Sequence, residues 1–102
     1  MREKLRCLAE LLRAQGDIVR ADWVEEALSS SDEAVDACLV SNNLWGGPGS
    51  IADCGGSEDP EGRKEIHAIL TELGEEQIRM EKVNARTAFW VEAFTKWRAM
   101  GL

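Results

Sequence analysis

Features that mark several other protein classes are missing from this chain of 102 residues. No apolar run approaches the roughly 18 residues that a membrane-spanning helix needs, so we expect no membrane contact. No segment alternates apolar and polar residues with the period of a strand, and no internal repeat is evident. The first residues are charged and lack the apolar stretch of a signal peptide. The sequence therefore predicts an all-α protein.

Cysteine and histidine are scarce. The chain has three cysteines, at Cys7, Cys38 and Cys54. Their number is odd, and no two of them have Cys-x-x-Cys spacing. The one histidine, His67, forms no ligand pair of zinc-site spacing with a cysteine. Carboxylate pairs at helical spacing, such as Glu72 and Glu76, lack the Glu-x-x-His partner of a metal-binding bundle. We therefore expect no cofactor, and reduced thiols in a cytoplasmic protein.

Basic residues are absent from the middle of the chain. No lysine or arginine lies between Ala21 and Gly62, although the net charge of the chain is −7. The same segment contains ten carboxylates, at Asp22, Glu25, Glu26, Asp32, Glu33, Asp36, Asp53, Glu58, Asp59 and Glu61. Such a segment repels phosphate, which argues against a nucleic-acid partner. It attracts a basic protein, and the alternative is a solvated acidic surface that serves only solubility.

Amphipathic helices account for the first forty residues. Leucines at helical spacing predict a helix over residues 2–15, which Gly16 ends. Asp17 is expected to cap a second helix over residues 18–28, antiparallel to the first. Ser30 and Glu33 fit a capping box for a third helix, which ends near residue 41 at the two following asparagines. A single domain spanning residues 1–102 is expected.

Two longer helices are predicted for the C-terminal half. Asp59 and Pro60 are a strong helix start, and we expect that helix to run through Gly74 to residue 82, with Gln77 and Met80 on its buried face. Asn84 is expected to cap a last helix over residues 85–100. The last helix carries the densest aromatic stripe, at Phe89, Trp90, Phe94 and Trp97. It is therefore predicted to form the spine of a compact bundle of about five helices.

A glycine-rich loop, residues 42–57, separates the two helical halves. A capping box from Ser50 to Asp53 predicts one short helical turn inside this ordered loop. We interpret the loop as a structural latch, in which Trp45 is a buried plug or, if exposed, an anchor for a partner. An alternative interpretation is a site for an anion or small molecule, lined by Gly46, Gly47, Gly49, Ser50 and Cys54. The loop lacks the Gly-Lys-Ser/Thr ending of a phosphate loop, and nothing in the sequence places Cys54 beside His67 as a nucleophile pair.

The segment Leu-Trp-Gly-Gly-Pro-Gly-Ser-Ile-Ala-Asp, which starts at Leu44 and ends at Asp53, resembles a pattern in a family of small uncharacterised bacterial helical proteins. In that family an aromatic residue is followed by Gly-Gly-x-Gly-Ser, an aliphatic residue and Asp. The match covers about ten residues and a similar helical layout. The resemblance implies a compact α-domain and assigns no catalytic residue.

The function that the sequence favours is a non-enzymatic module that presents the ten carboxylates to a basic protein. One form is an immunity or antitoxin-like protein, in which the acidic surface covers the basic cleft of a toxin. The alternative is a small-molecule or anion-binding protein, with an enzyme as one form of it, built on residues 46–50 and Cys54. A homodimer that uses Trp45 or the last helix is a third hypothesis.

Overall fold

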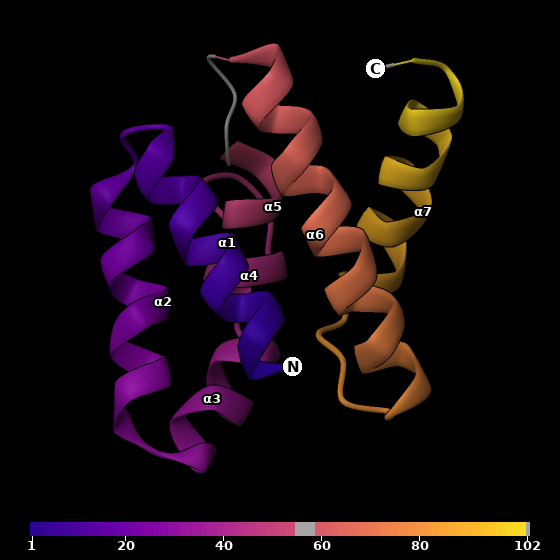
Figure 1. Cartoon of the computed structure of the whole chain (residues 1–102). Coiled ribbons are helices and arrows are strands. Elements are labelled where there is room, and N and C mark those ends of the chain that lie inside the picture. The colour runs from indigo at the N-terminus through magenta and orange to yellow at the C-terminus, as the bar shows by residue number, and fades with distance from the viewer. Residues whose placement is uncertain (55–58, 102) are drawn as a thin grey trace.

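The structure, a computed structural model, describes residues 1–54 and 59–101, with the side chain of Cys54 left out. The helices in these residues are α1 (Arg2–Ala14), α2 (Ile18–Ser30), α3 (Asp32–Leu39), α4 (Asn42–Trp45), α5 (Ile51–Cys54), α6 (Pro60–Arg79) and α7 (Thr87–Ala99) (Figure 1). The described residues contain no strand. The predicted all-α bundle is confirmed, because five of these helices have eight residues or more.

The α1–α2 hairpin forms as predicted. Leu5, Leu8 and Leu12 of α1 are completely buried. Gly16 closes the helix with a φ of +82°, a conformation that costs glycine little. Asp17 then caps α2, where its carboxylate accepts a hydrogen bond of 3.3 Å from the Arg20 N–H.

The caps around α3 differ from the prediction. Ser31, one residue after the expected cap, accepts the N–H of Ala34 at 3.1 Å, while the hydroxyl of Ser30 donates back to the Glu26 carbonyl within α2. Asn42 does not end the third helix. It begins α4, because the Ser41 hydroxyl accepts the Leu44 N–H and supplies a new helix cap.

Helix α6 continues through Gly74 without a break, as predicted. A methyl group at Gly74 would clash with the side chain of Val91 and would lie 3.1 Å from the Trp45 indole. Gln77 is buried as expected, but Met80 is 51% exposed, because α6 ends at Arg79, short of the predicted residue 82. Glycine at position 74 thus lets α7 and Trp45 pack closely on α6.

The prediction that the last helix is the spine of the core is wrong. Figure 1 shows α7 at the edge of the bundle, against α6, whereas α1 and α6 lie between α2 and α7. Trp90 and Phe94 are buried, but Phe89 is 60% exposed and Trp97 is 36% exposed. The aromatic stripe is wider than the face that α6 covers, so part of it stays in water.

The start of α7 also differs from the prediction. The helix begins at Thr87, two residues later than expected, and no side chain caps it. Asn84 instead accepts the Arg86 N–H at 2.9 Å, and its own N–H donates to the Thr87 hydroxyl at 3.0 Å. Asn84 therefore organises the turn that precedes α7.

Among the described helices, none combines the length and the apolar character that a membrane span requires.

Candidate functional site

The fold separates the ten predicted carboxylates into groups. Six of them belong to α2 and α3, two consecutive helices that pack together. Asp59 and Glu61 lie at the start of α6, at the opposite end of the molecule from α3 (Figure 1). Asp53 is on α5, and Glu58 lies outside the described residues. The α2–α3 group, here the acidic face, comprises Asp22, Glu25, Glu26, Asp32, Glu33 and Asp36.

Basic residues from other elements neutralise part of the acidic face. The Arg13 guanidinium of α1 donates to Asp22 at 2.7 Å and to Glu25 at 2.8 Å. Arg2 of α1 pairs with Asp32, and Lys82, after α6, contacts Asp36 at 3.3 Å. Neither the sequence spacing nor the local charge predicts these pairs, because each joins two different elements of the fold. They leave the six carboxylates facing three cations.

Glu26 and Glu33 have no ion-pair partner among the described residues, and both are exposed. Glu26 borders a groove of about 360 Å³ between α2 and α3. The groove is lined by Trp23, Glu26, Ala27, Ser30, Ala34, Ala37, Cys38 and Ser41. Its lining is mostly small side chains, beside one half-buried indole. Burial raises the pKa of the Cys38 thiol to about 11, so this group stays protonated and is no nucleophile.

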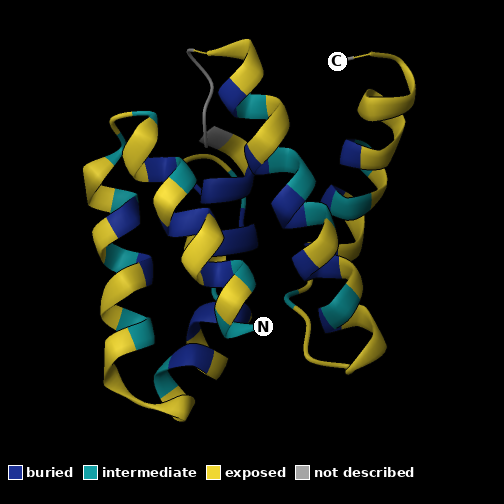
Figure 2. Cartoon of the chain, in the orientation of Figure 1, coloured by how far each residue is buried: buried dark blue, intermediate teal, exposed yellow. Residues whose placement is uncertain are grey.

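The described part of the glycine-rich loop, residues 42–54, packs inside the bundle through α4 and α5, where Figure 2 shows buried residues. Trp45 is completely buried, which rules out its predicted role as an exposed anchor. Its indole N–H donates to the Gln77 side-chain oxygen at 3.0 Å, and the Gln77 amide donates to the carbonyls of Leu39 and Lys82, each at 2.8 Å. The Trp90 indole donates to the Trp45 carbonyl at 2.9 Å. These bonds, here the latch, join both helical halves.

The alternative ligand site at residues 46–50 uses its polar groups internally. The N–H groups of Gly46, Gly49 and Ser50 donate to Asn42, Asp53 and Gly47, respectively. The Ser50 hydroxyl is buried and donates to the Gly46 carbonyl at 2.9 Å. These groups are therefore not turned toward an anion. Gly47 is half-buried, and no atom within 4 Å would meet an added methyl group there.

A cation does reach this loop, contrary to what the local sequence indicates. Arg20 of α2 donates to the Gly49 carbonyl at 3.0 Å and to Asp17 at 2.9 Å. Its guanidinium is thus engaged by a carbonyl and a carboxylate. The side chain of Cys54 lies outside the described residues, so the hypotheses that involve it stay predictions.

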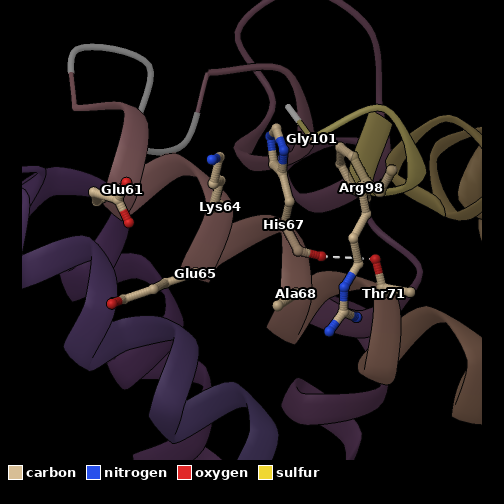
Figure 3. A pocket seen from close by; sticks show the side chains of 9 residues that line it. Glu61, Lys64, Glu65, His67, Ala68, Thr71, Arg98 and Gly101 are labelled. Carbon is tan, nitrogen blue, oxygen red and sulfur yellow. Dashed lines mark hydrogen bonds between the residues drawn. The ribbon is translucent and has the colours of Figure 1, made fainter. Parts of the chain in front are cut away.

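A second hollow, which the sequence did not indicate, lies between α6 and the end of α7 (Figure 3). It measures about 300 Å³ and is lined by Glu61, Lys64, Glu65, His67, Ala68, Thr71, Phe94, Arg98 and Gly101. Figure 3 shows His67 and Lys64 pointing the same way, with the Arg98 guanidinium turned in the opposite direction. Lys64 and Arg98 therefore do not converge on one anion.

His67 is half-buried in this hollow. Its ring stacks on Phe94 with the centroids 4.3 Å apart, and Trp97 lies beyond at 5.7 Å. Burial, and to a smaller extent the charge of Arg63, lowers the pKa of His67 to about 4. The imidazole is therefore neutral at physiological pH and packs as an aromatic ring.

Within the described residues no three His, Cys, Asp or Glu side chains group as metal ligands would. Glu76, one of the carboxylates at helical spacing, instead pairs with Lys4 of α1 at 2.8 Å. The hydrogen bond from Lys4 lowers the pKa of Glu76 and raises that of Lys4. This carboxylate therefore joins α1 to α6.

Comparison with protein families, curated proteins and solved structures finds no match to this chain. The resemblance of the segment around Trp45 to small bacterial helical proteins stays a prediction. The acidic face combines unbalanced charge with a groove. We take it as the candidate functional site.

Proposed function

We propose that this chain is a non-enzymatic protein-binding module whose acidic face docks a basic protein. The observation that carries the proposal is the charge imbalance on α2 and α3, where six carboxylates face three cations, two from α1 and one from the turn that follows α6. Opposite charge accelerates encounter and disfavours partners of the same sign.

The groove between α2 and α3 adds shape complementarity to the charge complementarity of the acidic face. Its small side chains, such as Ala34 and Ala37, leave room for an apolar side chain of the partner. Glu26 on one wall and Glu33 at the start of the other helix would receive lysine or arginine from the partner. One form of this function is an immunity or antitoxin-like protein that covers the basic cleft of a toxin.

The experiment compares three immobilised forms of the full chain. The wild type is set beside Glu26→Gln/Glu33→Gln, which removes the two carboxylates without ion-pair partners. The control Glu10→Gln/Glu75→Gln removes two exposed carboxylates outside the acidic segment, so both variants have the same net charge. Each column is loaded with the same lysate at low salt and eluted with a salt gradient.

We expect the wild type and the control to retain a discrete basic protein that the Glu26/Glu33 variant loses at lower salt, because rim charges tune association and its salt dependence. The eluted proteins are identified by mass spectrometry, and the retained one is then purified for rate measurements. Equal retention on all three columns, or retention of acidic proteins alone, would contradict the proposal.

A further inference from the structure

An apolar stripe along α7 and its cap is largely exposed to solvent. Phe89 is 60% exposed, Met100 is 71% exposed and Trp97 is 36% exposed. Together with the half-buried Ala93, these residues follow one another at intervals of four, four and three. That spacing puts all four on one face of a helix. The stripe lies beside the face that holds Trp90 and Phe94, the residues that α7 buries.

A charged pair runs along one flank of the stripe. Glu92 and Lys96, one helical turn apart, form an ion pair of 3.2 Å in which both side chains are 70% exposed. Two α7 helices related by a two-fold axis and running in opposite directions would place this flank against the same flank of the other copy. Glu92 of each copy would then face Lys96 of the other.

We propose that α7 is a self-association surface, which pairs with α7 of a second copy in antiparallel orientation. In the same register that sets Glu92 opposite Lys96, Phe89 comes to lie beside Met100 of the other copy. Ala93, a small residue, lies near the two-fold axis and lets the helices approach. Apolar and charged positions are thus complementary to themselves in a single register.

The flank of α7 favours a second copy over the basic partner of the acidic face. Helix α7 and its cap carry Arg86, Lys96 and Arg98 against the single carboxylate Glu92, so a basic protein would be repelled, whereas a second copy offers a glutamate to each Lys96 and a lysine to each Glu92. Figure 1 shows α7 and α2 on opposite sides of the molecule. Pairing through α7 therefore keeps the two acidic faces apart and leaves both accessible.

The expected dimer is weak. One face of a 13-residue helix is a small contact compared with the standard interface of about 1,600 Å². A dissociation constant in the micromolar range or weaker follows, since association must also offset the loss of rotational and translational freedom. The state of the chain should therefore depend on concentration.

The first test is sedimentation of the full chain across a range of concentrations, at moderate and at high salt. Wild type should shift from monomer to dimer, and the shift should persist at high salt because the stripe is apolar. Phe89→Gln/Met100→Gln should weaken the dimer by at least about tenfold. Val19→Gln, on α2 and 81% exposed in the wild type, is the matched control and should dimerise as wild type does. Circular dichroism verifies that each variant is folded.

The second test addresses orientation and register. Glu92→Lys should weaken the dimer, because it sets two lysines against each other across the axis. Glu92→Lys/Lys96→Glu exchanges the charges and should restore the wild-type dissociation constant. A chain that stays monomeric at all concentrations overturns the proposal. So does a dimer that Phe89→Gln/Met100→Gln leaves intact, that Val19→Gln dissociates, or that the exchanged pair does not restore.

Discussion

The acidic face on α2 and α3 and the edge helix α7 leave different chemistry in water. On α2 and α3, excess carboxylates are partly balanced by arginines and a lysine that reach across from other elements. On α7, the charges are few and three large apolar side chains are exposed. The first surface suits a partner of opposite charge, and its binding should weaken with salt. The second suits an apolar partner, and its binding should not.

The latch keeps these two surfaces in place. Gln77 accepts the Trp45 indole N–H and donates to the carbonyls of Leu39, the last residue of α3, and of Lys82, after α6. The Trp90 indole of α7 donates to the Trp45 carbonyl. Every buried side-chain polar atom in the described residues has a hydrogen-bond partner. The placement of the two surfaces relative to each other therefore depends on one polar cluster in the core, whose hydrogen bonds are all satisfied.

The largest effect is expected from breaking the latch itself. Trp45→Ala leaves a cavity and strips Gln77 of its donor, so it should lower the free energy of unfolding by about 3–5 kcal/mol. Trp45→Phe keeps a ring but loses the indole N–H, and a cost of about 1–3 kcal/mol is expected. Urea denaturation followed by circular dichroism measures both. A loss below about 1 kcal/mol for Trp45→Ala would show that the loop is dispensable.

A smaller loss of stability is expected from adding a methyl group at Gly74, where α7 packs on α6. Gly74→Ala gains about 1 kcal/mol of helix propensity but pushes Val91 away, and its stiff β-branched side chain cannot swing aside. A net destabilisation of about 1–3 kcal/mol follows. Gly62→Ala is the matched control, because there the added methyl meets only the flexible tip of Gln15, and a small gain is expected. Shifts of the same sign in thermal unfolding would contradict this distinction.

Acid should destabilise the α7 side through His67. The pKa of His67 is about 4 in the folded chain, against about 6.5 for the free side chain. The unfolded chain therefore takes up the proton first, and stability present above pH 6.5 is lost as the pH falls toward 4. Discounted for partial exposure, the loss between about pH 7 and 5 is about 1 kcal/mol.

The variant His67→Phe removes that titration and retains a ring to stack on Phe94. Its free energy of unfolding should change less between about pH 7 and 5 than that of the wild type. Denaturant titrations at several pH values measure the difference. Parallel pH profiles for the two proteins would show that the burial of His67 has no energetic consequence.

The smallest effect on stability is expected on the acidic face. Arg13→Gln removes an exposed guanidinium, so it should cost at most about 1 kcal/mol. It also frees Asp22 and Glu25, which should accelerate association with a basic partner at low salt. Arg6→Gln makes the same change in net charge at an exposed position of α1 without an ion pair among the described residues. Equal rates for the two variants would show that net charge, rather than this face, governs encounter.

Local signals in the sequence predicted most of the fold. Leucine spacing and Gly16 located the first hairpin, and Asp59 and Pro60 located the start of α6. Boundaries failed where two similar residues compete, as at Ser30 and Ser31, because the choice depends on how the chain leaves α2. The aromatic stripe of α7 was misread because a helix pattern shows which residues are apolar, but not how much of that face a neighbour covers.

The candidate site was predicted only in its charge. The absence of basic residues between Ala21 and Gly62 indicated an acidic surface, and the fold gathers six of its carboxylates on α2 and α3. The ion pairs from Arg13 join the consecutive helices α1 and α2, and those from Arg2 and Lys82 join elements that are more distant in the chain. The bond between Trp45 and Gln77, and the stack of His67 on Phe94, are also non-local. Such contacts follow from tertiary packing, which no local pattern records.

The most direct test of the separation between the two surfaces is the association rate constant of the purified basic partner, measured by stopped flow from about 20 to about 300 mM salt. On the proposal of two separate surfaces, Glu26→Gln/Glu33→Gln slows association severalfold at low salt and flattens its salt dependence. Phe89→Gln/Met100→Gln should leave the rate constant per acidic face unchanged. A rate that is independent of salt in the wild type, or one that the α7 variant lowers as much as the acidic-face variant, would contradict it.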